Sequence, residues 1–271
     1  MKKKVLAVVM AAGLSMAMAA CTSQQPAEVA APTEAATAPE TTETSEPTEA
    51  PAEPTEAPTE AEEPVAEPEA EVMTYADYVA AEVDDPVVVE AYVQANQSWW
   101  DGKITVYAQD KDGAYFIYNM ACDSQEEADK LTKGTKIRVN GFKAEWSGEI
   151  EIADATYEIV DGDTYVAEPV DVTDLLGKDE LIDKQNQLVS FKDMTVVSVA
   201  YKNDTPGDDI YVKLSKDDAE YDFCLEYYLN GSDQEFYDLV GGLKAGDVVD
   251  VEGFLYWYEG VNTHITAVTV K

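Results

Sequence analysis

One stretch of the chain, Gly134-Thr-Lys-Ile-Arg-Val-Asn-Gly-Phe-Lys-Ala-Glu-Trp-Ser-Gly148, returns 112 residues later as Gly246-Asp-Val-Val-Asp-Val-Glu-Gly-Phe-Leu-Tyr-Trp-Tyr-Glu-Gly260. Glycines occupy the first, eighth and fifteenth places of both copies, and a Gly-Phe pair lies in the middle. β-Branched residues precede each Gly-Phe pair, which is typical of a strand. A repeated supersecondary unit of this kind predicts two structurally similar modules.

The surrounding sequence extends each copy to five predicted strands, with a helix between the third and the fourth. In the first copy the strands are predicted near residues 86–95, 104–108, 115–118, 136–145 and 149–159. In the second copy they are predicted near residues 188–199, 210–214, 221–227, 248–256 and 263–270. A Ser-x-x-Glu capping box begins the helix of each copy, at Ser124 and at Ser232, and Thr74 is expected to cap a short helix ahead of the first copy.

Five strands with this helix are the plan of the OB-fold, a small, partly open Greek-key barrel. Gly141 and Gly253 lie where a strand must bend sharply to close such a barrel. Over residues 86–271 the two copies resemble the tandem OB-fold-like surface lipoproteins of Gram-positive bacteria, and no functional residue is carried over with that resemblance. We predict a mostly β protein with two tandem OB-fold-like five-stranded barrels, over residues 73–166 and 167–271. A pair of SH3-like or sandwich-like barrels is the alternative, and it leaves the capped helices without a role.

The N-terminus has the pattern of a processing signal. Lys2, Lys3 and Lys4 precede an apolar run, and the following Met18-Ala19-Ala20-Cys21 resembles a bacterial lipobox. The resemblance implies cleavage before Cys21, so that residues 1–20 form a signal peptide and the thiol carries a lipid with acyl chains such as palmitate. Two acyl chains hold a protein stably at a membrane, so we expect the extracellular face of the cell membrane. An ordinary secretory signal cleaved near Ala20 is the alternative.

A linker is predicted after the lipidated cysteine, over residues 21–72. Residues 22–72 hold nine of the twelve prolines and fourteen glutamates, with no lysine, arginine or aromatic residue. Such a composition cannot bury enough apolar surface to offset chain entropy, and it predicts an extended, disordered spacer. Residues 73–271 then hold 41 acidic and 15 basic residues, a net charge of −26. That charge repels phosphate backbones, so nucleic acid is an unlikely partner on sequence grounds.

The candidate ligand-binding residues are aromatic. OB-folds usually bind on their second and third strands, between the loop joining strands one and two and the loop joining strands four and five. The aromatic residues in or beside those loops are Trp99, Trp100, Trp146, Tyr201, Trp257 and Tyr258. Their rings can stack on sugars or bases, or they can brace hairpins, which we favour for the tryptophans of the later hairpins. Trp99 and Trp100 are neighbours whose side chains should point to opposite faces, so at least one should be difficult to bury.

Catalysis and metal binding have little support in the sequence. No phosphate loop, nucleophile elbow or metalloprotease motif is present. The single histidine, His264, is predicted to pack in the last strand, and the aspartate pairs are explained by turns. We therefore predict no catalytic residue, no metal ligand and no organic cofactor. Cys122 and Cys224 are expected to be partly buried thiols, with an inter-domain disulfide as the alternative.

These patterns predict a membrane-anchored extracellular binding or adaptor protein without catalytic activity. Its expected partners are the membrane, through the lipid on Cys21, and a cell-wall glycan, a peptide or an envelope protein. The alternative is an extracellular protein that binds single-stranded nucleic acid, which needs a basic track along one barrel. A metal-assisted hydrolase built on aspartate clusters is a third, weaker hypothesis.

Overall fold

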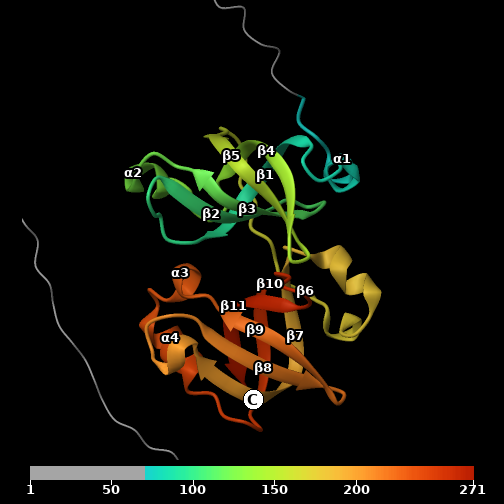
Figure 1. Ribbon diagram of the computed structural model, residues 1–271, viewed down its shortest axis with the longest axis vertical. Coiled ribbons are helices and arrows are strands. Elements are labelled where there is room, and N and C mark those ends of the chain that lie inside the picture. The colour runs from blue at the N-terminus through green and yellow to red at the C-terminus, as the bar shows by residue number, and fades with distance from the viewer. Residues whose placement is uncertain (1–70) are drawn as a thin grey trace, which may run out of the picture. The chain divides into compact units, whose positions relative to one another are not determined.

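The computed structural model describes residues 71–271, which belong to one compact unit (Figure 1). The predicted signal peptide, the lipid site at Cys21 and the linker up to residue 70 lie outside the described residues. Strands dominate the described part, and none of its helices is long and apolar enough to cross a bilayer.

The first barrel closes in the strand order β1-β2-β3-β5-β4. Its strands are β1 (Pro86–Asn96), β2 (Lys103–Gln109), β3 (Ala114–Ala121), β4 (Lys136–Trp146) and β5 (Glu149–Ile159). β1 pairs antiparallel with both β2 and β4, and β3 pairs parallel with β5. This connectivity is that of the OB-fold.

The second barrel has the same connectivity. Its strands are β7 (Leu188–Tyr201), β8 (Ile210–Lys216), β9 (Ala219–Leu225), β10 (Val248–Phe254) and β11 (Asn262–Val270). β7 pairs with both β8 and β10, and β9 pairs parallel with β11, so the ring of pairings again closes. The predicted fold class, two OB-like five-stranded barrels, is confirmed.

The segment between the barrels contains elements that the sequence did not predict. It holds the short strand β6 (Val170–Asp171), parallel to β7, and two 3₁₀ helices, η1 (Thr173–Leu175) and η2 (Asp179–Lys184). A third 3₁₀ turn, η3 (Lys202–Asp204), follows β7. The domain boundary that we predict after residue 166 falls ahead of β6, between the two barrels.

Each barrel has its own apolar core, because alternate residues of every strand point inwards. Val89, Ile117 and Ile137 belong to the first core, and Phe191, Leu214 and Val251 belong to the second. The strands bend at the two predicted glycines: the pairing register shifts at Asn140–Phe142 in the first barrel and at Glu252–Gly253 in the second. A Cβ on Gly141 would lie 2.8 Å from the carbonyl oxygen of Ala153, so only glycine allows the strands to approach this closely.

The helices are short, and their starts follow capping chemistry. They are α1 (Tyr75–Ala80), α2 (Gln125–Ala128), α3 (Tyr227–Asn230) and α4 (Gln234–Gly241). Thr74 and Asp77 form a reciprocal capping box at α1, and the Ser124 hydroxyl accepts from the Glu127 N–H at α2. The predicted cap of α4 is wrong by one residue. Asp233 accepts from the Phe236 N–H there, because the chain is still completing the turn after α3 at Ser232.

This correction gives a first prediction. Asp233→Ala should lower the free energy of unfolding by about 1 kcal/mol, because the first turn of α4 loses its side-chain acceptor. Ser232→Ala is the matched control and should leave stability within about 0.5 kcal/mol of the wild type. Urea unfolding curves of the two variants measure the difference. A larger loss in Ser232→Ala than in Asp233→Ala would restore the cap that we first expected.

Candidate ligand-binding site

The face where OB-folds usually bind is partly covered in the first barrel. Six buried residues from both barrels pack there as one cluster, which we call the seam: Tyr107, Phe116, Ala167, Leu188, Phe254 and Tyr256. The Tyr107 ring of β2 stacks on Phe254 of β10, with centroids 4.2 Å apart and planes 6° apart. Phe116 of β3 meets Tyr256 edge to face at 5.3 Å. The second barrel therefore occupies the part of this face around Tyr107 and Phe116, and a ligand on the rest of the face stays a prediction.

His264 belongs to the seam's polar contacts. Its Nδ1 lies 2.8 Å from the Tyr107 hydroxyl, and its ring stacks on Tyr256. Burial lowers the pKa of His264 to about 3, so the imidazole is neutral near pH 7. The histidine is buried and contacts Tyr107 and Tyr256, which agrees with the packing role expected for it.

A buried carboxyl group also lies between the barrels. Glu149, at the start of β5, has no exposed surface. Its Oε2 accepts from the backbone N–H of Trp257 at 2.8 Å and from Gln185 Nε2 at 3.1 Å. Burial raises the pKa of Glu149 to about 8. Glu226 is a second carboxyl group with a raised pKa. Burial, and then the charge of Asp209, raises its pKa to about 7. Both carboxyls favour the protonated form in the folded protein.

An open aromatic cleft lies beside the covered face. It has a volume of about 320 Å³. We call it the aromatic cleft, and its lining residues are Gln97, Ser98, Trp100, Lys103, Ile104, Thr105, Asn119 and Tyr228. Its two rings come from different barrels, since Trp100 precedes β2 and Tyr228 lies in α3. Trp100 is 79% exposed and Tyr228 is 59% exposed, so both rings present free surface.

The local backbone explains why one tryptophan of the pair is free. Trp100 and Lys103 exchange two backbone hydrogen bonds of 2.9 Å, closing a tight turn in which Gly102 takes a φ of +77°. Trp99 faces the other way, packs against the first core and donates its Nε1–H to the Cys122 carbonyl at 2.8 Å. The prediction that at least one of the two neighbours would be difficult to bury is confirmed, since Trp100 is exposed.

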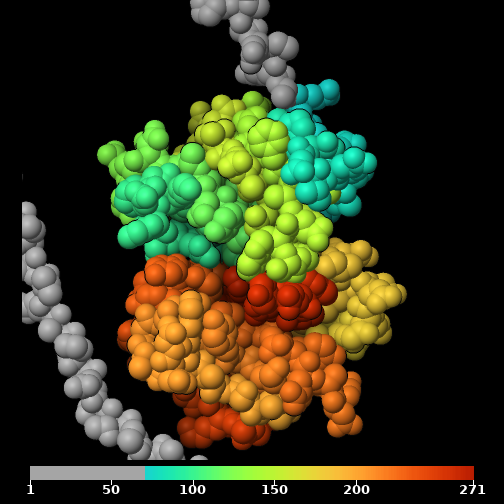
Figure 2. All heavy atoms as spheres, viewed as in Figure 1, coloured from blue at the N-terminus to red at the C-terminus, as the bar shows by residue number. Residues whose placement is uncertain are grey.

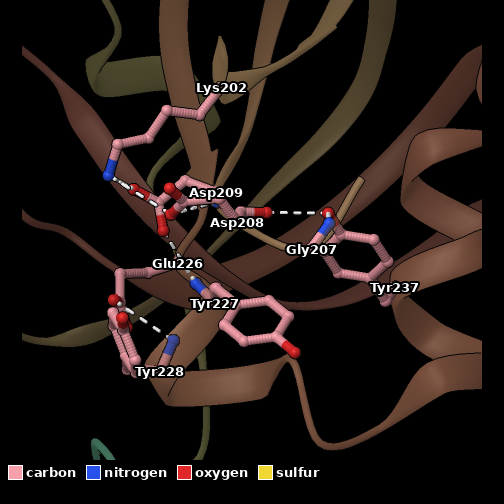
Figure 3. A network of polar contacts seen from close by, with 8 residues as sticks. All are labelled: Lys202, Gly207, Asp208, Asp209, Glu226, Tyr227, Tyr228 and Tyr237. Atoms are coloured by element: carbon pink, nitrogen blue, oxygen red, sulfur yellow. Dashed lines mark hydrogen bonds and ion pairs between the residues drawn. The ribbon is translucent and has the colours of Figure 1, made fainter. Parts of the chain in front are cut away.

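A polar network holds Tyr228 in place (Figure 3). Asp209 accepts from the Tyr227 N–H at 3.0 Å, and the Glu226 carboxyl accepts from the Tyr228 N–H. Asp209 is itself paired with Lys202 at 2.9 Å. The Tyr228 carbonyl then accepts from the Ser98 N–H at 2.8 Å, which ties α3 to the first loop of the other barrel. The cleft is therefore built on fixed backbone from both barrels.

Tyr228 is the residue that sequence reasoning missed. The third strand of the second copy was expected to run to Tyr227, which would have placed the next residue in a loop. The strand instead ends at Leu225, and Glu226 caps α3. The adjacent Tyr227-Tyr228 pair was the available signal, by the same argument that applied to Trp99-Trp100.

The remaining aromatic candidates do not line this cleft. Trp146 and Tyr258 come from the two strand-four/strand-five hairpins. Their ring centroids lie 5.2 Å apart, and both side chains are partly exposed. The hairpin tips touch, since the Glu259 N–H donates to the Ser147 carbonyl, and Figure 2 shows the yellow-green hairpin against the red C-terminal segment. Trp257 packs against the second core and beside Gly148. Tyr201 packs against that core and Tyr237, so it braces the barrel.

The equivalent face of the second barrel carries paired charges. Lys213 on β8 and Asp222 on β9 form an ion pair of 2.7 Å, and Tyr211 beside them is half exposed. In the first barrel, Lys136 and Arg138 both pair with Glu90, and Lys111 pairs with Asp112. These cations are distributed among carboxylates, so they form no basic track.

The described part of the chain contains neither a metal-binding cluster nor a disulfide. Residues 71–271 contain no group of three or more His, Cys, Asp or Glu side chains placed to hold a metal ion. Cys122 and Cys224 are free, buried thiols, so the alternative of a disulfide between them is wrong. Burial raises the pKa of the Cys224 thiol, which keeps it protonated.

Comparison with known proteins gives similarity only to solved structures. No protein-family model matches the chain, and no curated protein matches it in sequence. A murine DNA-binding protein bound to double-stranded DNA is 11% identical, with a TM-score of 0.34 over 69% of this chain and 94% of that one. The p204 HINb domain is also 11% identical, with a TM-score of 0.30 over 70% and 98% of the two chains. A replication protein A heterotrimer bound to single-stranded DNA has 12% identity and a TM-score of 0.30, over 69% and 49%.

The buried carboxyl group of Glu149 gives a pH prediction. Its pKa in the unfolded chain is near the ordinary value of 4.5, so between pH 4.5 and about 8 the folded state binds more protons than the unfolded state. Stability is therefore greatest below pH 4.5 as far as this group is concerned, and it falls by up to about 1.4 kcal/mol per pH unit as pH rises to 8. Glu149→Gln should flatten this decline in urea unfolding measured from pH 5 to pH 8.

The control for this experiment is Glu145→Gln, on the exposed side of the same hairpin. The free energy of unfolding of this control should decline with rising pH as that of the wild type does. Some decline should remain in Glu149→Gln, because Glu226 contributes with the same sign. A Glu149→Gln variant whose stability falls as steeply as that of the wild type would show that this carboxyl is ionised in the folded protein.

Proposed function

We propose that this chain is a non-catalytic binding protein whose aromatic cleft receives a ring of an uncharged ligand, with a cell-wall glycan as its first candidate. The exposure of Trp100 and Tyr228 carries the proposal. Two large exposed rings at one cleft leave apolar surface in water, which is unfavourable unless a partner covers it.

The polar lining of the cleft suits a sugar. Gln97 and Asn119 supply amide donors and acceptors beside the rings, and Lys103 adds an exposed ammonium group at the edge. A pyranose has one apolar face for stacking and hydroxyl groups around its rim, so it can use both kinds of lining at once. The acidic surface of the chain opposes a polyanion but does not oppose a neutral glycan.

Attachment to the outer face of the membrane is the second part of the proposal. It rests on Cys21 in its lipobox-like context and on the charged, proline-rich linker that follows. A segment of this length between the lipid and the barrels would allow the barrels to reach ligands in the envelope. The resemblance to Gram-positive surface lipoproteins belongs to this part of the proposal, and it rests on the repeated Gly-Phe segment within residues 86–271. A peptide or an envelope protein is the other partner compatible with such a location.

Single-stranded nucleic acid is the second candidate function. The OB connectivity, the stacking surface of Trp100 and the neighbouring Lys103 favour it, and the solved structures named above include DNA complexes. Two observations count against it. Part of the usual binding face of the first barrel, at Tyr107 and Phe116, is buried in the seam, and several cations of this barrel are already paired with carboxylates.

Titration of the full chain with fragmented cell-wall glycan, followed by tryptophan fluorescence, tests the proposal. A saturable change should appear, and Trp100→Ala should weaken binding roughly tenfold because it removes one stacking ring. Trp146→Ala is the matched control, since Trp146 is 53% exposed but lies outside the cleft. It should bind as the wild type does.

An oligothymidylate titration in low salt decides between the two candidates. Binding of the oligonucleotide that weakens with added salt and with Trp100→Ala, without any response to glycan, would replace the glycan with nucleic acid. The absence of binding to both ligands would leave the cleft without a ring-stacking role and would contradict the proposal.

The lipid anchor has its own test. Cys21→Ser should abolish labelling of the chain by radioactive palmitate and move it from the membrane fraction to the soluble fraction, because the acylated thiol is lost. Ser23→Ala, two residues away, is the control and should stay labelled and membrane-bound. Unchanged fractionation of Cys21→Ser would remove the lipoprotein interpretation.

A further inference from the structure

A second cavity, separate from the aromatic cleft, lies on the first barrel between α1 and η2. It has a volume of about 420 Å³. Tyr75 and Tyr78 of α1 form one wall, Ile150 of β5 forms another, and η2 closes the cavity with Ile182 and Asp183. Val79 and Ile182 are partly exposed at this site, which leaves apolar surface open to a ligand.

Two deeply buried polar side chains line this cavity without a complete set of partners. The Tyr78 hydroxyl has no hydrogen-bond partner, and neither has the Oδ1 of Asn186. Both residues are more than nine-tenths buried. The other polar groups of Asn186 are used, because its Nδ2 donates to the Ile150 carbonyl and its N–H donates to the Leu255 carbonyl. A buried polar group left unpaired is costly, so these two atoms point to something that completes them.

Two neighbouring polar side chains, Lys143 and Gln185, have their donors engaged elsewhere. Lys143 directs its ammonium group at the carbonyls of Tyr78, Val79 and Ala81, at 2.7 to 3.1 Å, and these use its three donors. Gln185 donates its side-chain amide to Gly148 and Glu149. Burial raises the pKa of Tyr78, so its hydroxyl keeps its proton and is a donor. Among the residues that line the cavity, the Tyr78 hydroxyl is left as a donor and Asn186 Oδ1 is left as an acceptor.

We propose that this cavity binds the acylamido group of a ligand, with the ligand's carbonyl accepting from the Tyr78 hydroxyl and its N–H donating to Asn186 Oδ1. An amide carries one acceptor and one donor and no charge, which matches the pair of unpartnered atoms. Its alkyl group would contact the exposed aliphatic side chains Val79 and Ile182. The exposed carboxylate of Asp183 disfavours an anionic ligand at the same place.

Ordered water alone accounts for these observations less well. One water molecule occupies about 30 Å³ and needs two to four polar partners, whereas this cavity is more than ten times larger and has aromatic and aliphatic walls. The acylamido group can come from an N-acetylated amino sugar or from a peptide, and the experiment separates these two sources. The inference stands independently of the aromatic cleft, because the two sites share no lining residue.

Isothermal titration calorimetry of the full chain tests this site with three small probes. These are N,N′-diacetylchitobiose, N-acetylalanine N′-methylamide and cellobiose, which is a neutral disaccharide without an acylamido group. At least one acylated probe should bind, and cellobiose should not. Binding of the sugar alone assigns the acylamido group to a glycan, and binding of the alanine derivative alone assigns it to a peptide.

Tyr78→Phe is the decisive variant, because it removes the donor and keeps the ring. This variant should weaken binding of the acylated probe roughly three- to tenfold. Its stability should match or exceed that of the wild type, since the lost hydroxyl had no partner. Tyr115→Phe changes a buried ring 5.0 Å from Tyr78 that does not line the cavity, and it is the matched control. Trp100→Ala should also bind the acylated probe normally, which separates this site from the cleft.

Three results would overturn the proposal. They are the absence of binding by either acylated probe into the millimolar range, equal binding of cellobiose, and a Tyr78→Phe variant that binds the acylated probe as tightly as the wild type.

Discussion

The stacking of Tyr107 on Phe254 is the contact on which the arrangement of both barrels depends. It removes two aromatic faces from water, and stacked pairs contribute about 0.5–1.5 kcal/mol beyond the area that they bury. The Tyr107 hydroxyl enters the seam with its ring and would be left unpaired there, but it meets His264 at 2.8 Å. The seam therefore joins a stacking contact to a satisfied buried polar pair, which constrains how the two faces fit together.

This contact changes what a tandem OB-fold can do. An isolated OB barrel offers the outer face of its second and third strands to a ligand. Here Tyr107 and Phe116 of that face are buried in the seam, so the first barrel uses part of its usual binding face to hold the second barrel. The available surface moves to the edge of the seam, where Tyr228 of one barrel meets the Trp100 turn of the other. The cleft is a product of the pairing, since neither barrel contains both rings.

Charge decides which ligands suit this surface. The chain is strongly acidic, and cations of the first barrel such as Lys136 and Arg138 are held by Glu90. Pairing of this kind leaves little positive potential to attract a phosphate backbone. A neutral ring in the aromatic cleft and a neutral acylamido group in the cavity at Tyr78 would both avoid that repulsion. The two proposed sites are thus consistent with one class of uncharged, polar ligand.

The repeated Gly-Phe segment was sufficient to predict two OB-like barrels, because strand alternation and strand-bending glycines are local properties of a sequence. The same local reasoning predicted that at least one of Trp99 and Trp100 would be difficult to bury, and it indicated the caps at Thr74 and Ser124. It placed the cap of α4 one residue early, because the α3 turn that sets its start had not been anticipated.

The candidate sites were decided by contacts between residues far apart in the chain. The Tyr228 carbonyl is tied to the Ser98 N–H, 130 positions away, and Asn186 lines the same cavity as Tyr78 because the segment before β7 packs on the first barrel. No periodicity encodes such pairings, since they depend on how two finished barrels fit against each other. The sequence by itself determined the barrels and the chemical character of their surface, whereas tertiary packing determined which aromatic rings remain open to a ligand.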